Sequence, residues 1–329
     1  MDTGTHFVIG ISLAGLSSID PAITNNHTLS QVVLLGTVIG SQAPDLDGIT
    51  RFFGGTCSYI KSHRGITHSL LAIIIWPIVI SSLIMLFYPS IPYFHLVFWT
   101  FVAVLVHIIL DIFNSYGTQA LRPFSQKWIA LNIINIFDPF IFIIHIIAIL
   151  IWSLQKFNSV YIFSTVYLLT IIYLVVRTWA YYNTLNRLRY LHKITGKLIM
   201  LPTIRWSVWN VIQKTPSKYN IGVVRNKKLQ WIESRVLPKK HKAIEASKLD
   251  KKVKVLLNFS NYTYPEWKKT PFGYEVHWFD LRYRFNNHYP LLAIVLLDES
   301  YQIIDSYIGW TYNQGQISKK VDILIKQHL

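Results

Sequence analysis

The chain has 329 residues, of which 52% are hydrophobic and 15% are charged, and its formal net charge is +16 at pH 7. Cys57 is the single cysteine, which excludes an intramolecular disulfide and a zinc site built from several thiolates. This length allows two domains, and the distribution of charge indicates where they divide.

Residues 1–177 hold seven Lys and Arg against six Asp, whereas residues 178–329 hold twenty-five Lys and Arg against ten acidic residues. The first part is predicted to be a transmembrane helical domain. It is followed by a basic connecting helix at residues 178–200 and a small, basic, β-rich soluble domain at residues 201–329. The basic part could contact anionic membrane lipids or nucleic acid. The preference of basic residues for the cytoplasmic side explains the charge without either partner, and no nucleic-acid-binding motif is present.

The first part contains about six apolar segments, which predict a polytopic membrane domain. Residues 7–19 and 29–43 are shorter than a bilayer span and could form a helical hairpin, a re-entrant pair or tilted helices. Four better-defined segments, each about 20 residues long, follow them. These four are residues 66–87, 94–113, 133–152 and 160–177.

The second part carries strand signals. Residues 274–285 have the aromatic, partly alternating pattern of a strand. Residues 291–297 and 303–310 predict a hairpin that turns at residues 298–300. The lysine-rich connection at residues 239–254 is predicted to be partly helical.

Five polar motifs interrupt the apolar part, although ionisable groups in or beside a bilayer are costly. They are Pro44-Asp45-Leu46-Asp47, His63-Arg64-Gly65-Ile66-Thr67-His68-Ser69, His107-Ile108-Ile109-Leu110-Asp111, Asn114-Ser115-Tyr116-Gly117 and Asp138-Pro139. If the six segments alternate in direction, all five motifs and His6 lie on the same side. The loops of that side carry Arg51, Lys61, Arg64, Arg122 and Lys127, whereas the opposite loops carry Lys156. The motifs are therefore expected to face the cytoplasm.

The mixture of imidazole and carboxylate predicts a divalent metal site, with zinc or manganese as the expected ion. His107 and Asp111 share one helical face, and Arg64 has the planar group that pairs with phosphate. Arg64 and Asp45 are the candidate catalytic residues. The candidate ligands are His6, Asp45, Asp47, His63, His68, His107, Asp111 and Asp138.

Several of these residues also have simpler interpretations. His6 could be a ligand or a residue of the first turn, and Asp138 before Pro139 is typical of a helix cap. His27, His95 and His145 are interpreted as interfacial or packing residues, and His145 lies too deep to join the motifs.

The ordered motifs from Pro44 to Gly117 resemble those of the YdjM-type inner-membrane proteins, which are described as membrane-bound metal-dependent hydrolases. The resemblance covers residues 1 to about 180 and implies an integral membrane protein with a hydrolase site. The expected substrate is a phospholipid or another phosphoester at the cytoplasmic leaflet. The alternative is a non-enzymatic membrane scaffold or regulator whose polar cluster is structural. A transporter is disfavoured, because the motifs gather at helix ends and not at the midplane.

Overall fold

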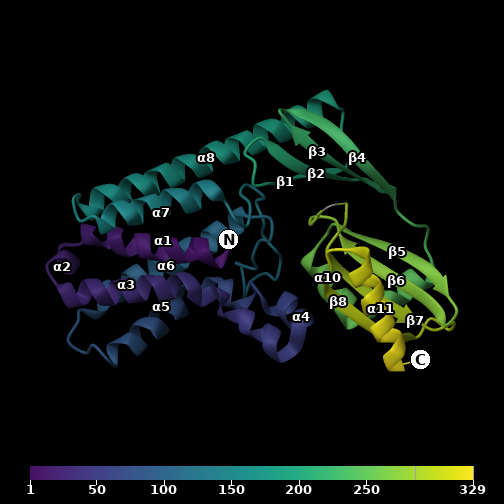
Figure 1. Cartoon of the computed structure of the whole chain (residues 1–329), viewed down its shortest axis with the longest axis horizontal. Coiled ribbons are helices and arrows are strands. Elements are labelled where there is room, and N and C mark those ends of the chain that lie inside the picture. The colour runs from purple at the N-terminus through teal and green to yellow at the C-terminus, as the bar shows by residue number, and fades with distance from the viewer. Residues whose placement is uncertain (286, 329) are drawn as a thin grey trace.

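The computed structural model describes residues 1–285 and 287–328 and shows a bundle of helices beside two β-sheets (Figure 1). The bundle consists of α1 (Thr3–Leu16), α3 (His27–Gln42), α5 (Leu70–Met85), α6 (Tyr93–Phe113), α7 (Pro139–Ser153) and α8 (Ser159–Leu191). Shorter elements connect them: the 3₁₀ helices η1 (Ser17–Ile19), η2 (Ala43–Ile49) and η3 (Ile66–His68), and the helices α2 (Pro21–Thr24) and α4 (Thr50–Ser62). Gly55, with φ of 64°, bends α4 in its middle.

The expectation of six membrane segments is not supported. Within residues 1–285 and 287–328, two helices, α6 and α8, are long and apolar enough to cross a membrane. The segment expected at residues 66–87 begins as η3, so its α-helix has only 16 residues. The helix expected at residues 133–152 begins only at Pro139, because Asp138 caps α7. Ile133 belongs to the preceding loop, where its backbone N–H donates to the carbonyl oxygen of Phe113 at the end of α6.

The last helix of the bundle joins it to the first sheet. α8 is a continuous helix of 33 residues that ends at Leu191, and β1 (Lys197–Pro202) follows it. The separate connecting helix expected at residues 178–200 is thus the final part of α8 together with the start of the sheet. The buried Arg177 donates hydrogen bonds to the carbonyl oxygens of Trp206 and Ile133, which ties α8 to the sheet and to the loop after α6.

Each sheet is a four-stranded antiparallel meander. The first contains β1, β2 (Val208–Lys214), β3 (Lys218–Arg225) and β4 (Lys228–Val236), and the second contains β5 (Thr263–Thr270), β6 (Gly273–Asp280), β7 (Leu291–Leu297) and β8 (Ile303–Trp310). α9 (Lys242–Ser247) and α10 (Lys251–Phe259) precede the second sheet, and α11 (Gln314–His328) follows it. The predicted hairpin is confirmed with the same bounds, whereas the strand expected to reach residue 285 ends at Asp280.

Three layers of apolar side chains hold these parts together. One face of the first sheet packs on α8, where Met200 and Val211 join Leu188 in one core. The other face packs on the second sheet and α11. All seven residues of β7 are buried, because α10 covers the far face of the second sheet. Ile60 of α4 and Tyr116 belong to that last core, so the second sheet and α10 lie against the end of the bundle that carries the polar motifs.

Candidate metal centre

The polar motifs converge at one end of the bundle. The first turn of α1 carries His6, η2 carries Asp45 and Asp47, and the last turns of α6 carry His107 and Asp111. The chain between α4 and the end of η3 contributes His63, Arg64 and His68. Most of these side chains are buried, in a protein whose charged groups are otherwise mainly exposed. Such burial requires a compensating partner.

Four ligand atoms form a compact group: Asp45 Oδ1, His68 Nε2, His107 Nε2 and Asp111 Oδ2, all within 4.8 Å of one another. The two imidazole nitrogens are 3.2 Å apart, and each lies between 3.3 and 3.7 Å from both carboxylate oxygens. A tetrahedral ion with ligand distances of about 2.0–2.1 Å separates its ligand atoms by about 3.3–3.4 Å. The group therefore has the size of a tetrahedral metal site.

The hydrogen bonds behind the two histidines leave both of these nitrogens free to bind a cation. His107 Nδ1 lies 2.7 Å from the carbonyl oxygen of Ser41, which can only accept, so Nδ1 carries the proton. His68 Nδ1 lies 3.1 Å from Thr67 Oγ1. The Thr67 hydroxyl donates its own proton to Asp47 Oδ2 and so accepts from His68. Nε2 of each imidazole is therefore unprotonated in the neutral form.

The hydrogen bonding of the two carboxylates and the ligand types also fit a divalent ion. Asp45 Oδ1 and Asp111 Oδ2 are buried and have no hydrogen-bond partner within residues 1–285 and 287–328. Arg64 Nε lies 3.1 Å from Asp111 Oδ2, but neither oxygen accepts a hydrogen bond, and a cation among them and the two imidazole lone pairs would offset the cost of their burial. Oxygen and nitrogen ligands without thiolate suit zinc, manganese or iron. The cluster can thus hold a metal ion.

Asp47 positions this group and is not part of it. Its Oδ1 contacts His63 Nδ1 at 2.6 Å, and its Oδ2 accepts from the Arg64 backbone N–H at 2.8 Å and from Thr67 Oγ1 at 2.5 Å. This carboxylate therefore holds the turn between α4 and η3, where Arg64 has φ of 59°. Asp45, Asp47 and His63 also form a second group of potential ligands, although both oxygens of Asp47 are already bonded.

The Arg64 side chain, predicted to bind phosphate, is already held by contacts within the protein. Its Nη1 donates to Asn114 at 3.2 Å and its Nη2 donates to the carbonyl oxygen of Met1 at 3.1 Å. Its Nε lies 3.1 Å from Asp111 Oδ2, in an alignment too poor for a hydrogen bond. The guanidinium also lies 4.8 Å from the ring centre of Tyr116. Arg64 therefore supplies a fixed positive charge beside Asp111.

Of the two candidate ligands with a simpler interpretation, His6 lies at the cluster and Asp138 does not. The His6 ring stacks on His107 with a centroid distance of 3.6 Å, and its Nε2 lies 3.3 Å from Asp111 Oδ1 and 2.8 Å from the amine of Met1. That amine also pairs with Asp111. Asp138 lies outside both ligand groups, because it caps α7 and accepts a hydrogen bond from Tyr173 at 2.7 Å.

The histidines expected to be ordinary packing residues lie elsewhere. His145 Nδ1 lies 2.8 Å from the carbonyl oxygen of Ile141, one turn earlier in α7, and its ring packs against Tyr167. His95 pairs with Asp20. Neither belongs to the two groups of potential ligands within the described ranges. Sequence reasoning missed the Ser41 carbonyl, which has no side-chain signal, and the role of Thr67, whose place between two histidines was a signal.

Burial and charge set the protonation of the potential ligands that lie outside the two long apolar helices, α6 and α8. Burial lowers the pKa of His68 to about 4, against the opposing pull of Asp45 and Asp47. Burial would raise the pKa of Asp45, but His68, His107 and Arg64 outweigh it and hold this pKa well below its usual value. Near neutral pH, His68 is therefore neutral and Asp45 is ionised. Metal ligands need these states.

Comparisons with known proteins agree with the two-part structure. Residues 1–184 match the family described as YdjM inner membrane protein, and residues 242–321 match the YfhP C-terminal alpha/beta plait domain. A curated relative in Bacillus subtilis (strain 168), described as uncharacterized protein YfhP, is 36% identical over 332 residues, which is 98% of this chain and 99% of the relative. No solved structure matches the chain.

Proposed function

Because the chain belongs to the YdjM inner membrane protein family, we propose that it is a membrane-bound, metal-dependent hydrolase of phosphoesters, with its site at the cytoplasmic leaflet. The observation that carries the proposal is the four-atom group of Asp45, His68, His107 and Asp111, whose spacing and unpartnered oxygens fit one divalent ion. A phospholipid is the substrate class best suited to a site at the end of an apolar bundle.

The protein side of the reaction follows from the positions of these residues. A divalent ion bound by the four side chains supplies Lewis acidity toward a phosphoryl oxygen and lowers the pKa of a water molecule. Asp45 is the most exposed member of the group, at 16%, whereas the side chains of His68, His107 and Asp111 are fully buried. Substrate and water therefore approach past Asp45, whose carboxylate orients the attacking water.

In this scheme the water oxygen forms a bond to phosphorus, the phosphorus–oxygen bond of the ester breaks, and the proton passes to the departing alkoxide. Arg64 holds its charge beside Asp111 and, through Asn114, at the end of α6. It favours the additional negative charge that develops on the phosphoryl oxygens. The catalytic roles of Arg64 and Asp45 are part of this proposal, as is the choice of zinc or manganese.

The test is an assay of the purified full-length protein against a panel of phospholipids and model phosphodiesters in micelles. We expect hydrolysis that a chelator abolishes and that zinc or manganese restores. His107→Ala removes a ligand and should lose activity across the panel. His145→Ala removes a buried histidine outside the cluster and should retain it. Equal activity of wild type and His107→Ala would reject the hydrolase and favour a scaffold whose polar cluster is structural.

A further inference from the structure

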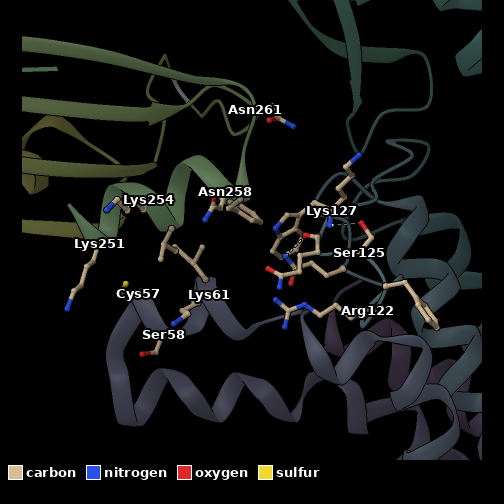
Figure 2. Close-up of a pocket in the computed structure, with 17 residues that line it drawn as sticks. Cys57, Ser58, Lys61, Arg122, Ser125, Lys127, Lys251, Lys254, Asn258 and Asn261 are labelled. Atoms are coloured by element: carbon tan, nitrogen blue, oxygen red, sulfur yellow. Dashed lines mark hydrogen bonds between the residues drawn. The ribbon is translucent and has the colours of Figure 1, made fainter. Parts of the chain in front are cut away.

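A cavity of about 1180 Å³ lies where α4, the loop after α6 and α10 meet (Figure 2). Among the residues that line it are Lys61 of α4, Arg122 and Lys127 of the loop, and Lys251 and Lys254 of α10. None of the described residues that line the cavity is acidic. A volume of this size is slightly above the usual range for ligand sites, about 300–1,000 Å³, and can take a group of many atoms.

The basic side chains of this cavity are not neutralised by the protein. Within residues 1–285 and 287–328, none of the five forms an ion pair. The nearest carboxylate along the chain, Asp250, is directed away, since it accepts from the backbone N–H groups of Lys252 and Val253 and from Ser306 Oγ. Five positive charges around one hollow repel one another and concentrate a field that attracts anions.

Two polar atoms at the cavity wall also lack partners. Arg122 Nε and Gln119 Oε1 are buried and form no hydrogen bond with any described residue. The Gln119 side chain is only 7% exposed, and its Nε2 donates to the carbonyl oxygen of Gln126 at 2.8 Å, which fixes the amide. A free guanidinium donor among lysines is suited to a phosphate oxygen, which it can bind in a bidentate manner.

The surroundings of the cavity favour a lipid over a soluble anion. Phe124 lines the cavity and is 86% exposed, and Phe52 and Phe53 on α4 are each 87% exposed. An exposed phenyl ring at a basic hollow, with two more on the helix that supplies Lys61, is typical of surfaces that enter the headgroup region of a membrane. α4 joins the bundle directly, which puts these rings at the end of the membrane domain.

The cavity is also linked to the candidate metal centre. The Gln119 backbone N–H donates to the carbonyl oxygen of Arg64 at 2.9 Å. Tyr116 contacts Arg64 on one side and packs against Phe259 and Trp128 of the cavity wall on the other. One aromatic layer thus separates the cavity from the four ligands.

From these observations we propose that the cavity binds the phosphate-bearing headgroup of an anionic lipid, with Arg122, Lys61 and Lys254 as the contacting cations. This goes beyond hydrolysis, because the binding needs no turnover and does not depend on the metal. The shared chemistry is a phosphate group, which could belong to a lipid or to a soluble molecule. The exposed phenylalanines assign it to the lipid.

The experiment is calorimetric titration of the full-length protein in neutral detergent with dihexanoyl phosphatidylglycerol, dihexanoyl phosphatidylcholine and inorganic pyrophosphate. We expect the anionic lipid to bind at least tenfold more tightly than the zwitterionic lipid. Arg122→Gln and, separately, Lys61→Gln should each weaken that binding about tenfold. Lys228→Gln, which removes an exposed charge at the turn between β3 and β4, is the matched control. Cys57 lines the cavity, so bound lipid should also slow its labelling by a thiol reagent.

Equal affinity for the two lipids, or an equal loss in Lys228→Gln, would overturn the proposal. Pyrophosphate binding as tight as that of the lipid would overturn the lipid assignment. Lys61 is exposed on α4, so its variant tests the cavity even if Arg122→Gln fails to fold. His107→Ala should retain lipid binding while it loses activity, which separates this proposal from the proposed hydrolysis.

Discussion

The Nε2 atoms of His68 and His107 lie 3.2 Å apart, and in the neutral rings neither carries a proton, because both Nδ1 atoms donate to other groups. Two such nitrogens repel unless a cation lies between them, and two unpartnered carboxylate oxygens complete the same enclosure. The fold therefore brings four groups together in an arrangement that a bound divalent cation would stabilise further, beside the charge of Arg64.

The first prediction concerns removal of the ion. A chelator should lower the melting temperature of the purified protein by about 5 °C or more, because an ion at 1,000 times its Kd adds about 4 kcal/mol to folding stability. His107→Ala should reduce bound metal at least about tenfold and should no longer respond to the chelator. Mass-spectrometric metal analysis and a thermal melt measure both effects. Loss of as much metal from His145→Ala or His95→Ala would show general misfolding and would contradict the assignment.

The second prediction concerns the hydrogen-bonded chain behind His68. Thr67→Val removes the hydroxyl that accepts from His68 Nδ1 and donates to Asp47, so the ring loses its fixed tautomer. We expect metal affinity to fall about tenfold, as it commonly does when a group that orients a ligand is removed. Thr67→Ser keeps the hydroxyl and should retain metal. Competition titration with a metal indicator measures the affinity, and equal affinity in the two variants would exclude the role of Thr67.

The third prediction concerns the charge beside Asp111. Arg64→Lys keeps a positive charge but loses the planar group that reaches both Asn114 and the carbonyl oxygen of Met1. Turnover of a phosphodiester should fall about tenfold or more, while bound metal stays within twofold of wild type. Arg51→Lys changes an exposed arginine of α4 in the same way and should be neutral. Unchanged turnover in Arg64→Lys would remove Arg64 from the proposed reaction.

The fourth prediction concerns orientation. Cys57 lies on α4, beside the polar motifs, and is expected to face the cytoplasm. A membrane-impermeant thiol reagent should leave it unlabelled in intact cells and label it in inverted vesicles. Burial raises the pKa of its thiol, so the thiolate is scarce at neutral pH and labelling should quicken as pH rises. Ready labelling in intact cells would show that Cys57 faces the outside and would contradict the predicted orientation.

The fifth prediction tests the packing of α1 on α8. A methyl group on Gly15 would overlap the ring of the buried Phe163, whereas one on Gly48 would meet open space. Gly15→Ala should therefore lower the stability by roughly 1–3 kcal/mol, and Gly48→Ala should leave the melting temperature nearly unchanged. Thermal melts of the two variants in one detergent provide the measurement. Similar melting temperatures would show that the two helices separate easily.

The sequence predicts the members of the cluster better than it predicts the helices that carry them. Asp45, His68, His107 and Asp111 are conspicuous because ionisable side chains are rare in apolar segments. Six membrane segments are not supported among the described residues, and hydropathy alone does not show that residues 66–68 form a 3₁₀ turn or that α7 starts only after Asp138. The simpler interpretation of Asp138 as a cap agrees with its hydrogen bonds to Phe140 and Ile141.

The division of labour among the polar residues could not be read from the sequence. Asp45 and Asp47 are two residues apart and chemically identical, yet one carboxylate faces the group of ligands and the other holds a turn. That difference depends on where η2 places each side chain against η3, which is a tertiary fact. The β7–β8 hairpin was predictable because its apolar runs and its turn are local in sequence.

The unbroken course of α8 makes it a spacer of fixed length. Its 33 residues extend about 50 Å, whereas the hydrocarbon core of a bilayer is about 30 Å thick. The buried Arg177 marks the level at which the helix reaches the loop after α6, and the first sheet packs along the four turns that follow. A single residue inserted into those turns would swing the sheet through about 100° around the helix axis. The distance and the orientation of the first sheet relative to the bundle thus depend on the number of residues in α8.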